Sequence, residues 1–424
     1  MTTDTRESSS ASGPSRAAKA GPLAGMRILD FSQAWAGPIA SMMLADLGAE
    51  VVKIEPPGLG DHVRGWTRPD LHGLSPYYLS ANRNKRGIVL DLKTERGREI
   101  ALELAERADV LLENFRPGAM DRLGLGWEIM HARNPALIYC SVSGYGSDGP
   151  YARRAAYDLL IQGEGGLLSV TGQSEDQLAK IGIPAVDVVA ANVAAFTILA
   201  AYTGRGSSGA GERLDISMLE IATTFMSTLL IDYAISGKVA KPMGTGNQLL
   251  APYQVYPTKS RPIVLGVLTE AHWAVLCDVL NRPDLLSDPR FETAPIRVIN
   301  RDALNDELVP ILATEEAEHW VEVLGGLGLA AGFVNNVETL LDHPQHDARG
   351  FIKTQVVEGV PVRAPGAPWR LSSSTEEDTR PPSRGQHTVE VLADWLSMPA
   401  SDIEVLTSTG VAVQAPPERS GPGD

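Results

Sequence analysis

The segment IPAVDVVAANVAAFTILAAY, residues 183 to 202, contains one formally charged side chain, that of Asp187. A lone carboxylate in apolar surroundings must lose its charge, find a partner or lie where its charge is used. Asp187 closely follows Pro184 and precedes a long apolar run, which predicts a position near the start of a helix. Asp187 therefore either caps the free N–H groups of that helix or serves as a nucleophile that they keep ionised.

Basic side chains gather in the segments NRNKRG, NFRPGAMDR and YARRAAY, which supply Arg83, Lys85, Arg86, Arg116, Arg122, Arg153 and Arg154. Arg116 directly follows the predicted strand DVLLENF. In open α/β sheets the loops at the carboxyl ends of the strands meet in one crevice. A polyphosphate ligand could be held there, and solvated surface charge is the alternative interpretation.

Several nucleotide-binding and catalytic motifs are absent from the sequence. The turn after the first predicted strand reads FSQAWAGP, so the G-x-G-x-x-G fingerprint of a dinucleotide site is missing. We find no Walker loop, G-x-S-x-G elbow or H-E-x-x-H pair, and the eight histidines show no metal-ligand spacing. We therefore predict no metal site.

Short apolar runs and amphipathic runs alternate between Met26 and Gly146, and they predict the strands and helices that carry several of these side chains. MRILDFS, AEVVKIE, GIVLDL, DVLLENF and ALIYCSVSGYG are typical of strands. PIASMMLADLG and TERGREIALELAERA are typical of helices, and Thr94 is expected to cap the second one. This alternation predicts an α/β fold with a Rossmann-like, mostly parallel sheet.

Changes in composition divide the chain into segments. The small and polar residues of 1–21 and 412–424 predict disordered tails. Residues 22–235 are expected to form the first part of a large α/β domain and residues 236–336 a smaller α+β domain. Residues 337–411 are expected to return to the large domain.

The charge balance argues against two classes of partner. A net charge of −15 and a pI near 5.1 oppose the broad basic face that nucleic acids or anionic membranes require. The two cysteines, Cys140 and Cys277, lie far apart and predict no disulfide framework. With no signal peptide or transmembrane span predicted, we expect a cytoplasmic protein.

Five motifs in one order resemble the class III CoA-transferases, the CaiB/BaiF family. They are LAGMRILDFSQAWAGPIASMMLADLGAEVVKIEPPGLGD, NRNKRGIVLDL, ADVLLENFRPGAMDRLGLGW, SVSGYGSDGPYARRAAYDLLIQGEGGL and the stretch around Asp187. The resemblance extends from about Leu23 to about Leu396. It implies a two-domain fold and a homodimer in which the two subunits interlock.

The resemblance also implies an active site. The family's nucleophile stands at the position of Asp187, and it would carry CoA as an aspartyl-CoA thioester from an acyl-CoA to a free carboxylic acid. CoA would be a co-substrate, and no cofactor would be tightly bound. The residues implied to bind CoA or to line the thioester pocket are Ala34, Trp35, Lys85, Asn114, Phe115, Arg122 and Tyr157.

Two other functions stay open at this point. The α-methylacyl-CoA racemases are similar to this family, but they place a His where this chain has Tyr157, which favours transfer over racemisation. A CoA-ester binding protein without catalysis is the other alternative. The presence of Asp187 favours an enzyme over that alternative.

Overall fold

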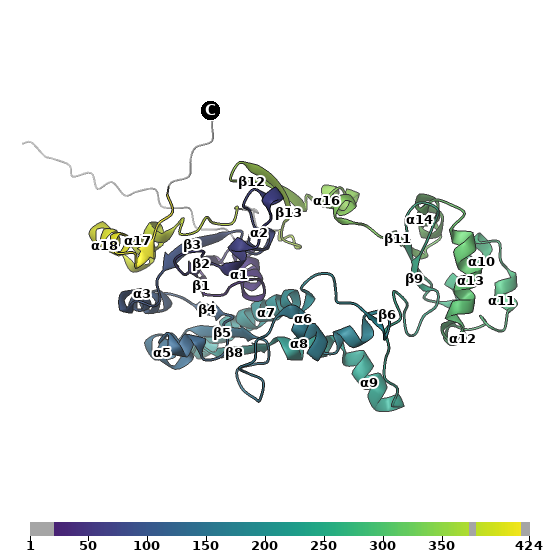
Figure 1. Cartoon of the computed structure of the whole chain (residues 1–424), viewed down its shortest axis with the longest axis horizontal. Helices are drawn as coiled ribbons and strands as arrows, with labels where there is room; N and C mark the ends of the chain where they lie inside the picture. The colour runs from purple at the N-terminus through teal and green to yellow at the C-terminus, as the bar shows by residue number, and fades with distance from the viewer. Residues whose placement is uncertain (1–20, 373–378, 417–424) are drawn as a thin grey trace, which may run out of the picture. The chain divides into compact units, whose positions relative to one another are not determined.

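The computed structural model describes residues 21–372 and 379–416 (Figure 1). The chain separates into two compact units, each described here by itself: Met1–Ile161, Pro184–Ile221 and Lys353–Asp424 make up the first, and Gln162–Ile183 and Ala222–Ile352 the second. These boundaries differ from the predicted ones. The second unit takes in residues 162–183, begins at Ala222 rather than at residue 236, and ends at Ile352 rather than at residue 336.

A seven-stranded sheet forms the centre of the first unit, with the strand order β14-β3-β2-β1-β4-β5-β8. Its strands are β1 (Arg27–Asp30), β2 (Glu50–Glu55), β3 (Lys85–Leu90), β4 (Val110–Glu113), β5 (Ile138–Ser143), β8 (Arg213–Ser217) and β14 (Ala412–Val413). Every neighbouring pair is parallel except β14 with β3. The predicted α/β class with a mostly parallel sheet is therefore confirmed.

The predicted C-terminal tail begins too early. Ala412 and Val413 form β14 and pair with Leu90 and Val89 of β3, and Ala412 is fully buried. The prediction of disorder from residue 412 is wrong for this strand, because two small apolar residues extend the edge of the sheet. Residues 1–20 and 417–424 lie outside the described residues, so the tail predictions there stay predictions.

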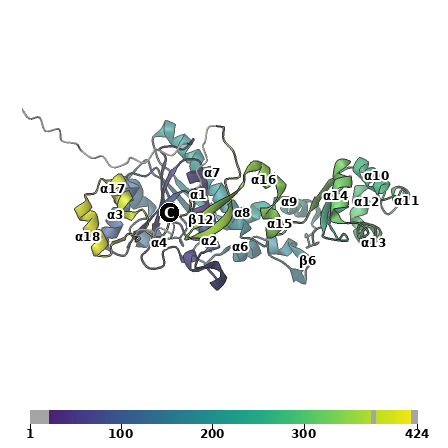
Figure 2. The same cartoon turned by 90° about the horizontal axis from the view of Figure 1, so that it is seen from above.

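Helices cover both faces of this sheet. They include α1 (Ala36–Asp46), α2 (Pro76–Ala81), α3 (Glu95–Ala105), α4 (Ala119–Arg122), α5 (Trp127–Arg133), α7 (Ala185–Ser208), α17 (Thr388–Leu396) and α18 (Ala400–Ser408). Figure 1 shows α3, α5, α17 and α18 on one side of the sheet and α1 and α7 on the other. Figure 2 also shows α3, α17 and α18 side by side, and their apolar faces meet in one core cluster. The predicted cap of α3 is confirmed, because the Thr94 hydroxyl accepts a hydrogen bond from the Gly97 N–H at 3.0 Å.

The direction of α7 follows from the sheet. Because β5 and β8 are parallel, the chain must return between them from the carboxyl edge to the amino edge of the sheet, and α7 makes this return. Helix α1 makes the same return between β1 and β2, and α7 packs against it. Both helices therefore begin at the carboxyl edge of the sheet.

Helix α7 is long and apolar enough, by length and composition alone, to cross a membrane, and so is the bent pair of α8 (Met218–Phe225) and α9 (Ser227–Ser236). One face of α7, with Val186, Ala190 and Ala194, is buried against α1, β5 and β8. Helix α7 therefore packs with one face against the core of the first unit. The prediction that no segment spans a membrane stays a prediction.

The second unit contains an antiparallel sheet in the order β11-β10-β9, formed by β9 (Tyr253–Tyr256), β10 (Ile263–Gly266) and β11 (Ala330–Phe333). Its helices include α10 (Glu270–Val279), α11 (Asp284–Ser287), α12 (Ala294–Ile299), α13 (Arg301–Leu312) and α14 (Ala317–Gly326). These elements enclose a separate core, in which Trp273, Leu308 and Trp320 are buried.

Candidate functional site

The strand order of the first unit reverses between β1 and β4, and ligands of open α/β sheets bind outside the carboxyl ends of the strands at such a point. The turns that follow these two strands are tied together by Asn114. Its Oδ1 accepts a hydrogen bond from the Gln33 N–H, and its Nδ2 donates to the Gln33 carbonyl oxygen, each at 2.8 Å. The candidate residues of the two turns therefore lie side by side.

Ala34 is held in an unfavourable backbone conformation at this edge. Its φ of 63° lies in the left-handed region, which costs a residue with a Cβ about 1–2 kcal/mol. The Ala34 N–H donates to Oδ1 of the fully buried Asp61 at 3.2 Å, and Oδ2 of Asp61 forms an ion pair with Lys53 at 3.0 Å. A buried charged group thus fixes the turn, and strain supported in this way is typical of functional sites.

Trp35 forms part of an aromatic cluster at the same turn. Its indole ring lies 5.4 Å from the ring of Tyr77, and its Nε1 donates to the Tyr77 carbonyl oxygen at 3.3 Å. Tyr77 in turn contacts Trp66, with ring centroids 5.1 Å apart, and both rings are partly exposed. These rings offer an apolar, partly exposed surface next to Ala34.

Both the ring and the backbone N–H of Phe115 have partners within the fold. The ring packs against the core cluster that lies between the sheet and α3. The Phe115 N–H donates to Oε2 of Glu113 at 2.8 Å.

Three arginines surround a pocket of about 300 Å³ beside this loop: Arg116, Arg122 and Arg153, together with Pro117 and Gly118. All three side chains are exposed. Within the described residues, none of them forms an ion pair or a hydrogen bond with another part of the protein. Guanidinium groups in this arrangement suit phosphate or carboxylate groups. The structure thus places Arg122, which the resemblance implied, with Arg116 and Arg153 from the other basic segments.

Lys85 is placed differently from the prediction. Its Nζ is fully buried and donates to Oδ2 of Asp30 at 3.1 Å, to the Pro38 carbonyl oxygen at 2.8 Å and to Oδ1 of Asn82 at 2.8 Å. Burial lowers the pKa of Lys85 to about 8, although the Asp30 carboxylate acts in the opposite direction. All three donors are used inside the fold, so this geometry argues against the predicted contact between Lys85 and a CoA phosphate.

The arginines of the same basic segment also have structural partners. Arg83 forms an ion pair with Asp46 at 2.5 Å, and Arg86 forms ion pairs with Glu50 at 2.6 Å and Asp394 at 2.8 Å. The segment runs into β3, which begins at Lys85, and so lies at the amino end of that strand, away from the carboxyl edge where the crevice is expected. It stabilises the fold rather than forming a ligand site.

Asp187 lies in the first turn of α7, but it does not cap the helix. The cap comes from Asp158, at the start of α6 (Asp158–Glu164): its Oδ2 accepts hydrogen bonds from the N–H groups of Val186 at 2.8 Å and of Asp187 at 3.2 Å. The interpretation of Asp187 as a helix cap is therefore wrong, because a carboxylate from another segment already occupies these donors.

The Asp187 carboxylate is half-buried and, within the described residues, has no hydrogen bond or ion pair. Burial, and secondly the charge of Asp158, raise the pKa of Asp187 to about 7. Near neutral pH both protonation states are consequently populated. The ionised form is more basic than an ordinary carboxylate and therefore a better nucleophile.

Tyr157 precedes Asp158, and its side chain is 68% exposed. Its carbonyl oxygen accepts a hydrogen bond from the Ile161 N–H at 3.1 Å at the start of α6. The predicted contact between Tyr157 and a substrate stays a prediction.

The candidate residues form two groups at one edge of the sheet. Ala34, Trp35, Asn114, Phe115 and Arg122 follow β1 and β4, whereas Asp187 begins α7, which starts at the same edge. Sequence reasoning did not identify the helix cap formed by Asp158 or the support of Ala34 by Asp61. Both contacts join segments that are far apart in the sequence, and no local pattern marks such pairs.

The chain is similar to known proteins both in sequence and in structure. The model of CoA-transferase family III matches residues 23–388. The chain is 35% identical over 395 residues to succinyl-CoA:glutarate CoA-transferase of Mus musculus, covering 93% of this chain and 91% of that protein. It is 35% identical over 362 residues to acetyl-CoA:oxalate CoA-transferase of Acetobacter aceti, covering 85% of this chain and 92% of that protein. The crystal structure of a CaiB/BaiF family protein from Brucella suis superimposes with a TM-score of 0.80 at 34% identity, covering 89% of this chain and 100% of that one.

Proposed function

The chain belongs to CoA-transferase family III, and from this premise we propose that Asp187 is the nucleophile that carries CoA from an acyl-CoA to a free carboxylic acid. The supporting observation is that Asp158, and not Asp187, caps the first turn of α7. Asp158 accepts hydrogen bonds from N–H groups in the first turn of α7, and among the residues that the structure describes the Asp187 carboxylate has no partner. A group held in this state is available to attack.

In the first half-reaction an Asp187 oxygen attacks the carbonyl carbon of the donor thioester. The C–S bond breaks, the CoA thiolate leaves, and a mixed anhydride joins Asp187 to the acyl group. The thiolate then attacks the Asp187 carbonyl carbon, which forms aspartyl-CoA and releases the donor acid as a carboxylate. The bonds formed and broken balance without any net transfer of protons or electrons.

The second half-reaction repeats these steps in reverse with another acid. Its carboxylate attacks aspartyl-CoA, and the released thiolate then attacks the acyl carbon of the new anhydride. The product acyl-CoA leaves and the Asp187 carboxylate is regenerated. The positive end of the α7 dipole stabilises negative charge near Asp187 during each attack.

The arginine pocket is our proposed site for phosphate groups of CoA. Arg116, Arg122 and Arg153 are available for charge-assisted hydrogen bonds to them. The backbone at Asn114 and Phe115 would lie along the pantetheine arm, and the turn at Ala34 and Trp35 would line the thioester pocket.

The relatives suggest which acids to test first. One relative is named for succinyl-CoA and glutarate, and another for acetyl-CoA and oxalate. We propose that the acids exchanged by this protein include a short dicarboxylate.

We further propose that the chain works as an interlocked homodimer. Helix α9 of the second unit exposes Leu230, Ile231, Tyr233 and Ile235, an apolar surface that a second copy could cover. A cytoplasmic location is also proposed, because Cys140 and Cys277 are both buried free thiols.

Mass spectrometry of the intact protein after incubation with acyl-CoAs, succinyl-CoA first, tests the covalent mechanism. We expect a CoA-sized adduct that hydroxylamine converts to a hydroxamate on the peptide containing Asp187. The variant Asp187→Asn should bind the same CoA esters without forming an adduct.

Binding of CoA esters by the natural protein without any adduct would contradict the proposal. In that case, deuterium uptake from heavy water at the α-carbon of a 2-methylacyl-CoA would indicate an isomerase instead.

A further inference from the structure

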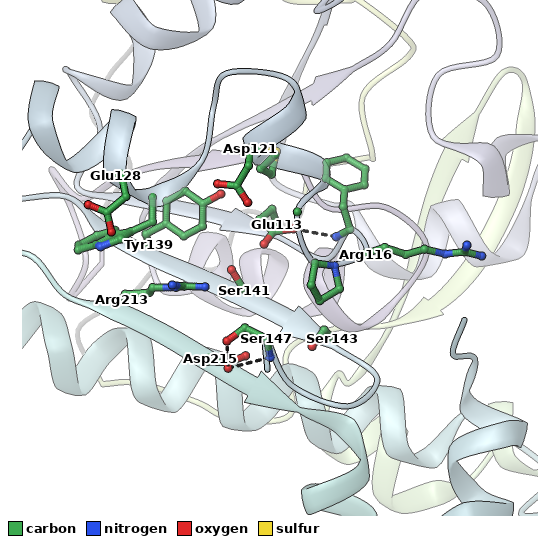
Figure 3. Close-up of a pocket in the computed structure, with 15 residues that line it drawn as sticks. Glu113, Arg116, Asp121, Glu128, Tyr139, Ser141, Ser143, Ser147, Arg213 and Asp215 are labelled. Carbon is green, nitrogen blue, oxygen red and sulfur yellow. Dashed lines mark hydrogen bonds between the residues drawn. The ribbon is translucent and has the colours of Figure 1, made fainter. Parts of the chain in front are cut away.

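A second cavity, of about 150 Å³, lies in the first unit beneath the loop that follows β4 (Figure 3). Strands β4 and β5 contribute Glu113, Tyr139, Ser141 and Ser143 to it. Acidic and basic side chains face it from the surrounding elements: Asp121 from α4, Glu128 from α5, Arg213 and Asp215 from β8, and Arg116 from the loop itself. Arg116 also lines the arginine pocket, whereas the other charged side chains of this cavity have no part in the proposed function.

Glu113 connects the cavity to the loop above it. Its side chain is only 7% exposed, and its Oε2 accepts the Phe115 N–H at 2.8 Å. The Ser141 side chain lines the same cavity. The loop is thus held at two adjacent points, at Phe115 by Glu113 and at Asn114 by the backbone of Gln33.

The strength of the first anchor depends on the charge of Glu113. A carboxylate accepts an N–H hydrogen bond more strongly than a neutral carboxylic acid does. Burial raises the pKa of Glu113 to about 7. Ser141, the Phe115 N–H and the charge of Arg213 offset part of this rise, and the charge of Asp121 adds to it. The anchor therefore changes strength close to neutral pH.

We propose that Glu113 is a positioning residue for the CoA-binding loop, which it holds at Phe115 as a carboxylate and releases in part when it takes up a proton. CoA affinity would fall as the pH falls, because a looser loop loses part of its preorganisation. The proposal rests on the proposed function, since CoA is assigned to Asn114 and Phe115 only there.

Calorimetric titration of the full chain with free CoA between pH 6 and pH 8.5 tests this role. Without an acyl group no transfer takes place, so only binding is measured. At pH 8 we expect Glu113→Gln to bind CoA about three- to tenfold more weakly than the natural protein, as the loss of one charge-assisted hydrogen bond implies. At pH 6 the two affinities should converge.

The 3′-phosphate of free CoA titrates in the same way in experiments with either protein, so its effect cancels in the ratio of the two CoA affinities. The matched control is Glu128→Gln, at the exposed rim of the same cavity, which should follow the natural protein at every pH. An affinity ratio for Glu113→Gln that does not change with pH would overturn the proposal. Glu113 would then either contribute to folding alone or have no role.

A second measurement decides the question if Glu113→Gln does not fold. The natural protein is titrated at pH 7 with 3′-dephospho-CoA, which lacks the titrating phosphate, in buffers of different ionisation enthalpy. Net proton release on binding is expected, and its absence would overturn the proposal. If the natural protein binds neither ligand at any pH, the proposed function itself fails, which is a distinct result.

Discussion

The carboxylate of Asp158 accepts a hydrogen bond from the backbone N–H of Asp187 at 3.2 Å and raises the pKa of the Asp187 side chain by its charge. One residue thus orients the first turn of α7 and tunes the acid group on it. This relationship gives Asp158 a positioning role that differs from the nucleophilic role proposed for Asp187.

The rate of enzyme loading by a donor acyl-CoA should rise with pH around an apparent pKa of about 7, because only ionised Asp187 attacks. Asp158→Asn keeps an oxygen acceptor for the cap but removes the neighbouring charge. We expect the rise to move to lower pH in this variant, measured by rapid-quench mass spectrometry. Asp148→Asn, at an exposed position of the preceding loop, is the control, and an unshifted profile for Asp158→Asn would contradict the tuning role.

The stability of Asp187→Asn should depend on pH relative to the natural protein. The folded-state pKa of Asp187, about 7, lies above the ordinary value of 3.8, so its contribution to stability is present below 3.8 and is lost as the pH rises to 7. We compare the free energy of unfolding of Asp187→Asn with that of the natural protein at pH 5 and at pH 8. The difference should shift in favour of the variant by about 1–2 kcal/mol between these two pH values, a figure discounted for the partial exposure of Asp187. Urea denaturation at both pH values measures this gain, and a gain in the opposite direction would count against a buried acid.

Arg153→Gln should weaken CoA binding about tenfold, because it removes one charge-assisted contact from the arginine pocket. The salt dependence of binding should also decrease, whereas the rate at saturating CoA ester should change little. Titration calorimetry at several salt concentrations measures both effects on binding. The exposed Arg107 supplies the control variant Arg107→Gln. Equal CoA affinities for the two variants would show that the arginine pocket does not bind a phosphate group.

Lys85→Met should lower the free energy of unfolding by about 3–5 kcal/mol, because it leaves the buried Asp30 carboxylate without its cation. The CoA affinity of the folded fraction should stay unchanged. Chemical denaturation and CoA titration of the same preparation separate the two effects. A stable variant with weakened CoA binding would restore the ligand role that the resemblance implied.

Much of the fold was predictable from local patterns. The alternation of apolar strands and amphipathic helices from Met26 to Gly146 predicted the parallel sheet, because a strand covered on both faces needs a continuous apolar run and a covering helix needs one apolar face. The short apolar strand β14 was missed, since two residues carry no period and gain their stability only from β3.

Local sequence patterns were sufficient to assign the family and to predict that Asp187 lies in the first turn of a helix, since ordered motifs and an apolar run are both local properties. Which charged groups have a partner depends on the tertiary fold. Lys85 lies opposite Asp30, Arg116 lies beside Arg153, and Asp158 caps the helix of Asp187 because distant segments meet in the fold. The charge state and reactivity of a side chain depend on such neighbours and on burial, and neither can be read from residues adjacent in the sequence.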